Sequence, residues 1–233
     1  MPDLTIFSQL ESATGFTFKN RDLLVQAFTH RSYLNENPGY RLGHNERLEF
    51  LGDAVLELVV TEELYDKFPN PEGDLTNLRA SLVNARTLAQ VALGLNFDAY
   101  LLLSRGESKD TNSKARHSIL ANAVEALIGA LYLDQGFTAA KKFVDAFILA
   151  KLPDILANQA YRDPKSTFQE NSQKNASVTP SYKVLAEWGP DHDKHFRVGV
   201  YLGAEEVAVG EGPSKQEAQV AAAVAALKAK GWS

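Results

Sequence analysis

The hydrophobic positions of residues 44–56 and 119–133 recur with the period of an α-helix. In the first run, the side chains that would anchor one side of the helix in a core are Leu48, Phe50, Leu51, Val55 and Leu56. The second run has few polar positions, which predicts a helix buried on most of its sides. These two patterns indicate an all-helical domain in the first part of the chain.

The pattern changes after about residue 163. Asp163-Pro-Lys165 is typical of a turn that leads into a helix, and residues 166–172 are predicted to form a short one. Short segments rich in valine and aromatic residues, separated by glycine, proline and aspartate, then predict strands at 181–188, 196–202 and 206–210.

A final helix closes the chain. Residues 218–229 are dense in helix formers, Ser214 and Glu217 have the spacing of a capping box, and Gly231 suits a helix end. The second part therefore has the order helix, three strands, helix. We predict a multidomain protein, with an all-α domain at 1–157, a linker at 158–162 and an α+β domain at 163–233.

Three acidic residues stand on one face of the first predicted helix. Glu46, Glu49 and Asp53 are spaced i, i+3 and i+7, so their carboxylates stack over two turns. Stacked like charges repel, and aligned carboxylates are typical ligands of a hard divalent cation. The alternative is a solvated acidic helix face, which the spacing alone favours.

The buried second helix carries Asn122 and Glu125 on one face. A carboxylate on such an apolar helix is costly unless it is paired or bound to metal. A cation shared between Glu125 and the acidic helix would meet this requirement. The alternative is a Glu125 satisfied by an arginine or by backbone donors.

At these residues the chain resembles the ribonuclease III family. Asn45-Glu-Arg-Leu-Glu-Phe-Leu-Gly-Asp53 is similar to the family's signature segment, and Ala27-Phe-Thr-His-Arg-Ser-Tyr33 to the segment before it. Glu72-Gly-Asp-Leu75 with Leu78-Arg-Ala80 matches the next block, and 119–133 matches the block that supplies the last metal ligands. The four motifs occur in the right order over about the first 150 residues.

The resemblance implies a metal-dependent endonuclease for double-stranded RNA. It makes Glu49, Asn122 and Glu125 ligands of Mg²⁺, for which Mn²⁺ can substitute, and Asp53 and Glu125 the catalytic positions. Asp53 would orient or deprotonate water. Glu46 and Glu72 would lie farther out, around a second ion or the substrate.

Family members act as homodimers in which each subunit cuts one strand, leaving 5′-phosphates and short 3′ overhangs. Phe50 matches a position that packs across the dimer interface. The alternative for Phe50 is an ordinary aromatic residue of the chain's own core, because aromatic side chains are enriched in both places.

The second domain resembles the double-stranded-RNA-binding domain. The local matches are Thr167-Phe-Gln-Glu170, Gly189-Pro-Asp-His192 and Gly210-Glu-Gly-Pro-Ser-Lys215. The residues that this resemblance implies for RNA contact are Gln169, Glu170, His192, Ser214 and Lys215. The chain departs from the family where Gln216 follows Lys215, since two consecutive lysines are usual there. Fewer cations predict weaker binding with a shallower salt dependence.

Asn122 is a more serious departure, because the family usually has aspartate there. An amide oxygen can ligate Mg²⁺, but it brings no negative charge. Three explanations stay open: an active natural variant, which we favour; a weak or inactive scaffold that binds duplex RNA without cutting it; and a substitution engineered to trap a complex. The intact Glu46, Glu49, Asp53 and Glu125 favour the first.

Charge alone would not predict an RNA partner. The net charge is −5, and residues 162–233 hold nine basic and nine acidic residues, so the excess of acid lies in the first domain. The chain has no cysteine, which excludes disulfides and thiolate metal sites. It has no signal-peptide pattern and no apolar stretch approaching 18 residues, so we expect a cytoplasmic protein that does not span a membrane.

Overall fold

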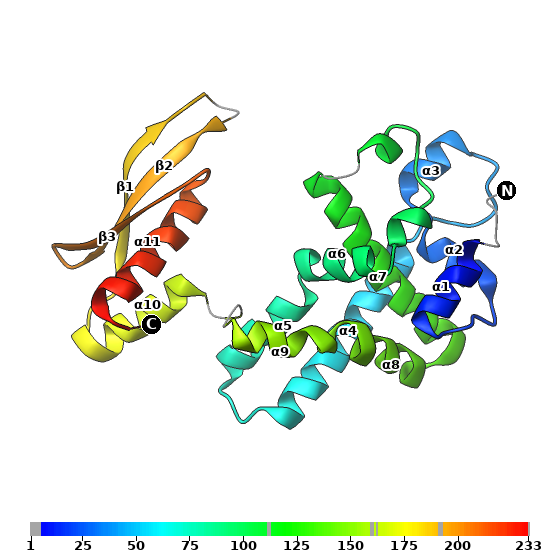
Figure 1. Cartoon of the computed structure of the whole chain (residues 1–233), viewed down its shortest axis with the longest axis horizontal. Coiled ribbons are helices and arrows are strands. Elements are labelled where there is room, and N and C mark those ends of the chain that lie inside the picture. Colours follow the sequence, from blue (N-terminus) through cyan, green and yellow to red (C-terminus); the bar gives the residue numbers. More distant parts are fainter. Residues whose placement is uncertain (1–5, 111–112, 159–160, 162, 191–192, 233) are drawn as a thin grey trace. The chain divides into compact units, whose positions relative to one another are not determined.

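The computed structural model describes residues 6–110, 113–158, 161, 163–190 and 193–232, and the chain divides into two compact units, 1–161 and 162–233 (Figure 1). The exact bounds of the linker stay a prediction. No helix in the described ranges has both the length and the apolar character needed to cross a membrane.

Helices make up the first unit, as predicted, together with an isolated parallel bridge between Thr29 and Leu102. Its α-helices are α1 Ile6–Thr14, α2 Arg21–Ala27, α3 Arg31–Glu36, α4 Glu46–Lys67, α5 Glu72–Val83, α6 Ala85–Gly94, α7 Lys114–Gln135, α8 Phe137–Phe147 and α9 Leu152–Ala157. Short 3₁₀ turns lie at η1 Phe97–Ala99, η2 Glu107–Lys109 and η3 Leu149–Lys151.

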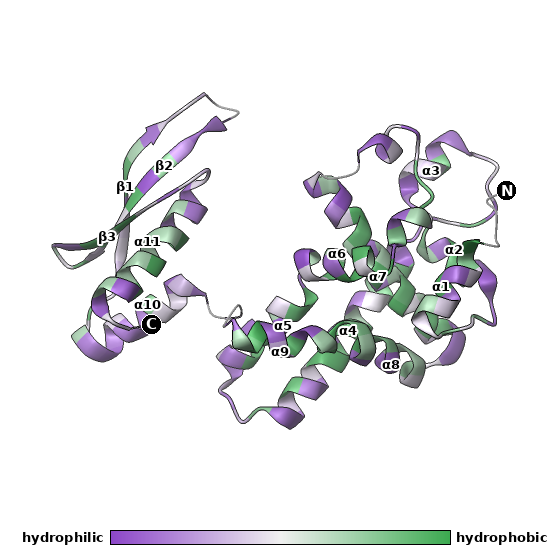
Figure 2. Cartoon of the chain, in the orientation of Figure 1, coloured by the Kyte–Doolittle hydropathy of each residue, from purple (hydrophilic) through white to green (hydrophobic). Residues whose placement is uncertain are grey.

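Two long helices, α4 and α7, form the centre of this unit. The side chain of Ser113 caps α7 by accepting a hydrogen bond from the backbone N–H of Arg116, and Gly136 ends it at a φ of +82°. The middle of α7 is almost entirely buried, and hydrophobic colour extends along it in Figure 2. The prediction of a buried helix is thus confirmed. Four helices pack against α7, namely α2, α4, α6 and α8.

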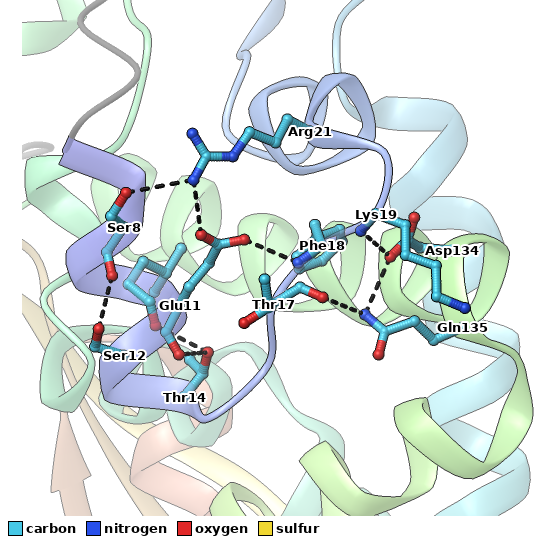
Figure 3. A network of polar contacts seen from close by, with 11 residues as sticks. Ser8, Glu11, Ser12, Thr14, Thr17, Phe18, Lys19, Arg21, Asp134 and Gln135 are labelled. Atoms are coloured by element: carbon cyan, nitrogen blue, oxygen red, sulfur yellow. Dashed lines mark hydrogen bonds and ion pairs between the residues drawn. The ribbon is translucent and has the colours of Figure 1, made fainter.

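A polar network joins the N-terminal helices to the end of α7 (Figure 3). The carboxylate of Asp134 accepts hydrogen bonds from the backbone N–H groups of Lys19 and Asn20, at 2.9 and 2.8 Å. Burial opposes ionisation, but these backbone donors outweigh it and hold the pKa of Asp134 below its usual range. Beside it, Glu11 accepts from the backbone N–H of Phe18 at 2.8 Å and pairs with Arg21 at 3.0 Å. The network fixes the connection between α1 and α2 against α7.

The second unit has the predicted order α-β-β-β-α. Its elements are α10 Pro164–Ala176, β1 Ser181–Trp188, β2 His195–Leu202, β3 Glu205–Gly212 and α11 Lys215–Lys230. The strands form an antiparallel sheet in the order β1-β2-β3, and both helices pack on one face of it, where Phe168, Val200 and Ala222 share a core.

The helix ends follow their sequence signals. Asp163 caps α10 by accepting hydrogen bonds from the N–H groups of Lys165 and Ser166, and this cap starts the helix two residues earlier than predicted. Ser214 accepts from the N–H of Glu217 at 3.1 Å at the start of α11, as predicted. Gly231 ends α11 with a φ of +67°, which glycine adopts without strain.

Candidate functional site

Two glycines bring α4 and α7 together at their crossing. A β-carbon built on Gly52 would lie 1.7 Å from the carbonyl oxygen of Glu125, and one built on Gly129 would lie 2.2 Å from the carbonyl oxygen of Leu48. The backbones of the two helices therefore touch directly, which no other residue type would permit. This contact sets Glu49 and Asp53, on either side of Gly52, against the helix that carries Glu125.

A sequence signal marks both glycines, although the spacing of the acids does not reveal their role. A glycine within an apolar helical pattern costs about 1 kcal/mol relative to alanine and usually has a packing reason. Gly52 and Gly129 each interrupt such a pattern. They position the candidate site, although they contribute no side chain to it.

The four central side chains of the predicted metal site interact across this crossing. The side chain of Asn122 donates a hydrogen bond to Glu49. Burial and the charges of Glu46 and Asp53 raise the pKa of Glu49. The hydrogen bond from Asn122 lowers it, but by less, so the pKa remains raised. Burial and the charges of Asp53 and Glu49 raise the pKa of Glu125 to about 8.

The surroundings of Glu125 bear on the predicted alternatives for this residue. Glu125 is partly buried, and the charges that act on its pKa come from the α4 carboxylates, not from an arginine. Among the described residues, no three His, Cys, Asp or Glu side chains form a ready metal cluster. The predicted ligand set is two carboxylates and one amide, and its oxygen donors and excess negative charge fit a hard divalent cation.

The two outer acids lie in different surroundings. Glu46, the first residue of α4, is exposed and lies 3.7 Å from both Arg31 and the Nδ1 atom of His44. Glu72, the first residue of α5, accepts a hydrogen bond from Thr76 at 2.9 Å and lines a pocket between α4 and α5. Glu46 acts on the pKa of Glu49, whereas Glu72 belongs to a separate part of the surface.

Phe50 is 82% exposed, although it lies on the helix that carries the acids. The interpretation of Phe50 as an aromatic residue of the chain's own core is therefore wrong. Glycine packing explains why: the face of α4 that meets α7 contains Gly52, and Phe50 lies two residues away and points outward. The exposed ring is available for another surface.

The second unit holds the described residues of the other predicted surface. Gln169 and Glu170 are exposed on α10. Phe168, the preceding residue of the same helix, is fully buried. Lys215 begins α11 and places its ammonium group 5.6 Å from the ring centroid of Phe196. The prediction for His192 lies outside the described residues.

Comparison with known proteins decides the family. Residues 20–152 match the Ribonuclease-III-like family model, and residues 164–230 match the double-stranded RNA binding motif. The chain belongs to the ribonuclease III family. Ribonuclease 3 of Enterococcus faecalis is 44% identical over 97% of this chain and 98% of its own length. Ribonuclease 3 of Desulforamulus reducens is 45% identical over 93% of this chain and 88% of its own.

A solved ribonuclease III nuclease domain is similar to the first unit. The domain from Campylobacter jejuni is 43% identical, with a TM-score of 0.55. The match covers 62% of this chain and 97% of the Campylobacter domain. That structure is described as flexible in a region involved in dimer formation. The ribonuclease III relatives support an active nuclease and give no support to the silent scaffold that Asn122 had left open.

The raised pKa of Glu125 predicts how stability depends on pH in a chelator. Between about pH 4.5, the ordinary pKa, and about 8, the folded chain keeps a proton that the unfolded chain releases. The free energy of unfolding should therefore fall as pH rises through this window. Urea unfolding from pH 4.5 to 9 measures it, and Glu125→Gln should remove most of the slope. An unchanged slope in Glu125→Gln would contradict the raised pKa.

Proposed function

We propose that this chain is a Mg²⁺-dependent endoribonuclease that hydrolyses phosphodiester bonds in double-stranded RNA, with Mn²⁺ as a substitute metal. The observation that carries the proposal is the convergence of Glu49, Asp53, Asn122 and Glu125 at the backbone contact of α4 and α7. The family supports a divalent metal at such a site. We place the activity in the cytoplasm, in the processing of ribosomal and messenger RNA.

In this proposal Glu49, Asn122 and Glu125 hold the metal ion. Bound Mg²⁺ supplies an activated water and neutralises negative charge on the phosphate. Asp53 is exposed beside Glu125, so it can orient the water and accept its proton. Water would add to phosphorus while the bond from phosphorus to the 3′ oxygen breaks. The 3′ oxygen would take up a proton from solvent and leave as a hydroxyl, and the phosphate would stay on the 5′ end.

Asn122 has two parts in the proposal. Its amide nitrogen donates to Glu49 and favours the ionised form of that carboxylate, while its oxygen remains a donor for the metal. An aspartate at the same place would add a further negative charge to the site that already holds Glu49, Asp53 and Glu125. The amide therefore lowers repulsion in the metal-free protein at the expense of attraction for the cation.

The test is cleavage of a long, fully paired RNA duplex by the purified chain, with Mg²⁺ and with chelator. We expect metal-dependent shortening to staggered duplexes that carry 5′-phosphates. Asn122→Asp should lower the Mg²⁺ concentration needed for half-maximal cleavage, with little change at saturating metal. RNA that is bound but left intact at all Mg²⁺ concentrations would reject the nuclease proposal. Recovery of cutting only in Asn122→Asp would mean that the amide is a defect.

Metal binding should also release protons. Because Glu125 is largely protonated at pH 7 in the metal-free chain, and metal ligands must be ionised, each bound Mg²⁺ should displace up to about one proton. Calorimetry of Mg²⁺ binding in two buffers with different heats of ionisation measures this number. Binding heats that are independent of the buffer would show that Glu125 is not a ligand.

We further propose that the chain acts as a homodimer that contacts itself through the exposed face of α4. Leu58 and Tyr65 are exposed on the same helix as Phe50, at 58% and 76%. The three residues are spaced eight and seven apart, so they form one stripe along α4. An exposed apolar stripe of this kind is typical of an interaction surface.

Phe50→Ala should shift the protein from dimer to monomer in analytical ultracentrifugation at micromolar concentration, because the ring fills space that methyl cannot. Leu93→Ala is the matched control, since Leu93 is an exposed apolar residue on α6, with 47% exposure. Equal dimer stability in both variants would contradict the assignment of Phe50 to the interface.

A further inference from the structure

The start of α11 carries one lysine and is followed by Gln216, so the helix itself brings little positive charge to RNA. Two lysines from other elements lie near the same end of α11. The structure assigns Lys165, Lys194 and Lys215 to one lysine cluster that binds phosphates of the duplex RNA backbone. This inference rests on the RNA-binding part of the proposed function and names two residues for it that sequence reasoning did not find.

Lys194 and Lys215 share one aromatic ring. Their Nζ atoms lie 5.9 and 5.6 Å from the ring centroid of Phe196. Lys194 immediately precedes β2, and Lys215 is the first residue of α11. Phe196 is held in place because it packs with the fully buried Val198 and Ala218. Each contact is a cation–π interaction. Each ammonium group has three N–H donors, and the ring uses none of them as a conventional hydrogen-bond acceptor.

Lys165 reaches α11 from the start of α10. Its Nζ atom donates a hydrogen bond of 2.6 Å to the side-chain oxygen of Gln219 and lies 5.1 Å from the ring centroid of Tyr182. Gln219 is four residues after Lys215, so both stand on one face of α11. The ammonium group of Lys165 is therefore placed one helical turn along from Lys215.

The rigid neighbours of these lysines suit phosphate binding. Tyr182 packs against both parts of the core, the one with Phe196 and the one with Phe168, so the rings under the lysines form one continuous support. Holding a flexible lysine in place before binding reduces the entropy lost on binding. The N-terminus of α11 adds free N–H groups and partial positive charge beside Lys215.

The carboxylate beside Lys194 opposes the assignment. Glu187 lies 3.5 Å from Lys194, and both side chains are substantially exposed. Such surface pairs contribute little free energy, so a phosphate can replace the carboxylate. Neither Lys165 nor Lys215 forms an ion pair within the described ranges. Two of the three cations are therefore available without breaking a pair.

The cluster also explains how a neutral unit binds a polyanion. Residues 162–233 carry equal numbers of acidic and basic residues, so net charge gives no attraction. Three ammonium groups at one helix end produce a local positive charge, although the net charge of the unit is zero. Shape recognition of A-form RNA depends on such phosphate contacts.

The experiment measures binding of a fluorescent 25-base-pair RNA duplex, a length chosen to exceed the roughly 16 base pairs that one such domain spans. The full chain is used in chelator, over a range of salt concentrations. Lys165→Gln, Lys194→Gln and Lys215→Gln should each weaken binding about three- to tenfold and reduce the salt slope by about one. Lys228→Gln is the matched control on the same helix, about 20 Å away, and should bind like the parent.

Two further variants separate charge from folding. Lys165→Arg keeps the charge and should bind like the parent, while a thermal unfolding midpoint tests whether Lys165→Gln remains folded. Gln216→Lys should restore affinity and slope to Lys194→Gln, because it returns a cation to the same helix end. If Lys215→Gln weakens binding but Lys165→Gln and Lys194→Gln match Lys228→Gln, the cluster is rejected. If Lys215→Gln also has no effect, the RNA-binding surface itself is misplaced.

Discussion

Glu125→Gln should lower the rate of RNA cleavage by about a thousandfold or more at saturating Mg²⁺. Glutamine keeps the size of the side chain but removes the charge that faces Asp53 and Glu49, and with it a metal ligand. The same variant should be more stable than the parent at pH 8 in chelator, because a partly buried, repelled carboxylate is gone. Loss of activity together with gain of stability is a combination that misfolding cannot produce.

The measurement is single-turnover cleavage of a labelled duplex, paired with urea unfolding of the same preparation. Glu62→Gln is the matched control, because Glu62 is an exposed acid on α4 that lies near Lys141, away from the crossing. It should cut RNA at the parent rate. If Glu125→Gln retains activity within tenfold of the parent, Glu125 is not a ligand of the metal.

Gly52→Ala should have the largest effect on the fold. The added β-carbon would lie 1.7 Å from the carbonyl oxygen of Glu125 and 2.8 Å from the backbone nitrogen of Gly129. These are backbone atoms of a buried helix, so no side chain can rotate away and α4 must move from α7. We expect a loss of about 3 kcal/mol or more in the free energy of unfolding. Cleavage should fall by about a hundredfold in the fraction that remains folded.

Gly94→Ala is the control for this variant. Gly94 also lies in a helix, at the end of α6, but a β-carbon there meets no atom within 4 Å. It should leave both stability and cleavage close to those of the parent, or raise stability slightly by restricting the unfolded chain. Equal behaviour of Gly52→Ala and Gly94→Ala would show that the helices can separate without cost to the site.

Much of the fold was predictable because its signals are local. The period of 119–133 predicted α7, and Ser214 with Glu217 predicted the start of α11. Short segments rich in valine and aromatic residues, bounded by turn residues, predicted the three strands. The irregular pairing of β1 with β2 was not predicted. Val184 pairs with Val198 and Ala186 with Arg197, so residue 185 is an extra residue in β1. Nothing in its composition distinguishes that strand from a regular one, since the bulge arises from pairing with another segment.

The candidate site was predictable in its chemistry and less so in its packing. Spacing placed Glu49 and Asp53 on one face, and the apolar pattern of 119–133 singled out Glu125 as a costly buried acid. Spacing could not show that Gly52 and Gly129 make the crossing, because this depends on which faces of two distant helices meet. Lys165 and Lys194 were missed for the same reason, since their approach to α11 exists only in the folded unit.

The contact between Asp134 and the segment that connects α1 to α2 constrains the residue type at position 134 more than at position 19. Its acceptor is a side chain, whereas its donors at residues 19 and 20 are backbone N–H groups that every amino acid except proline has. Residue 19 can therefore change freely among relatives, while a change at residue 134 leaves two donors without their acceptor. We expect a saturation library to accept almost any residue except proline at position 19, and few besides aspartate at position 134.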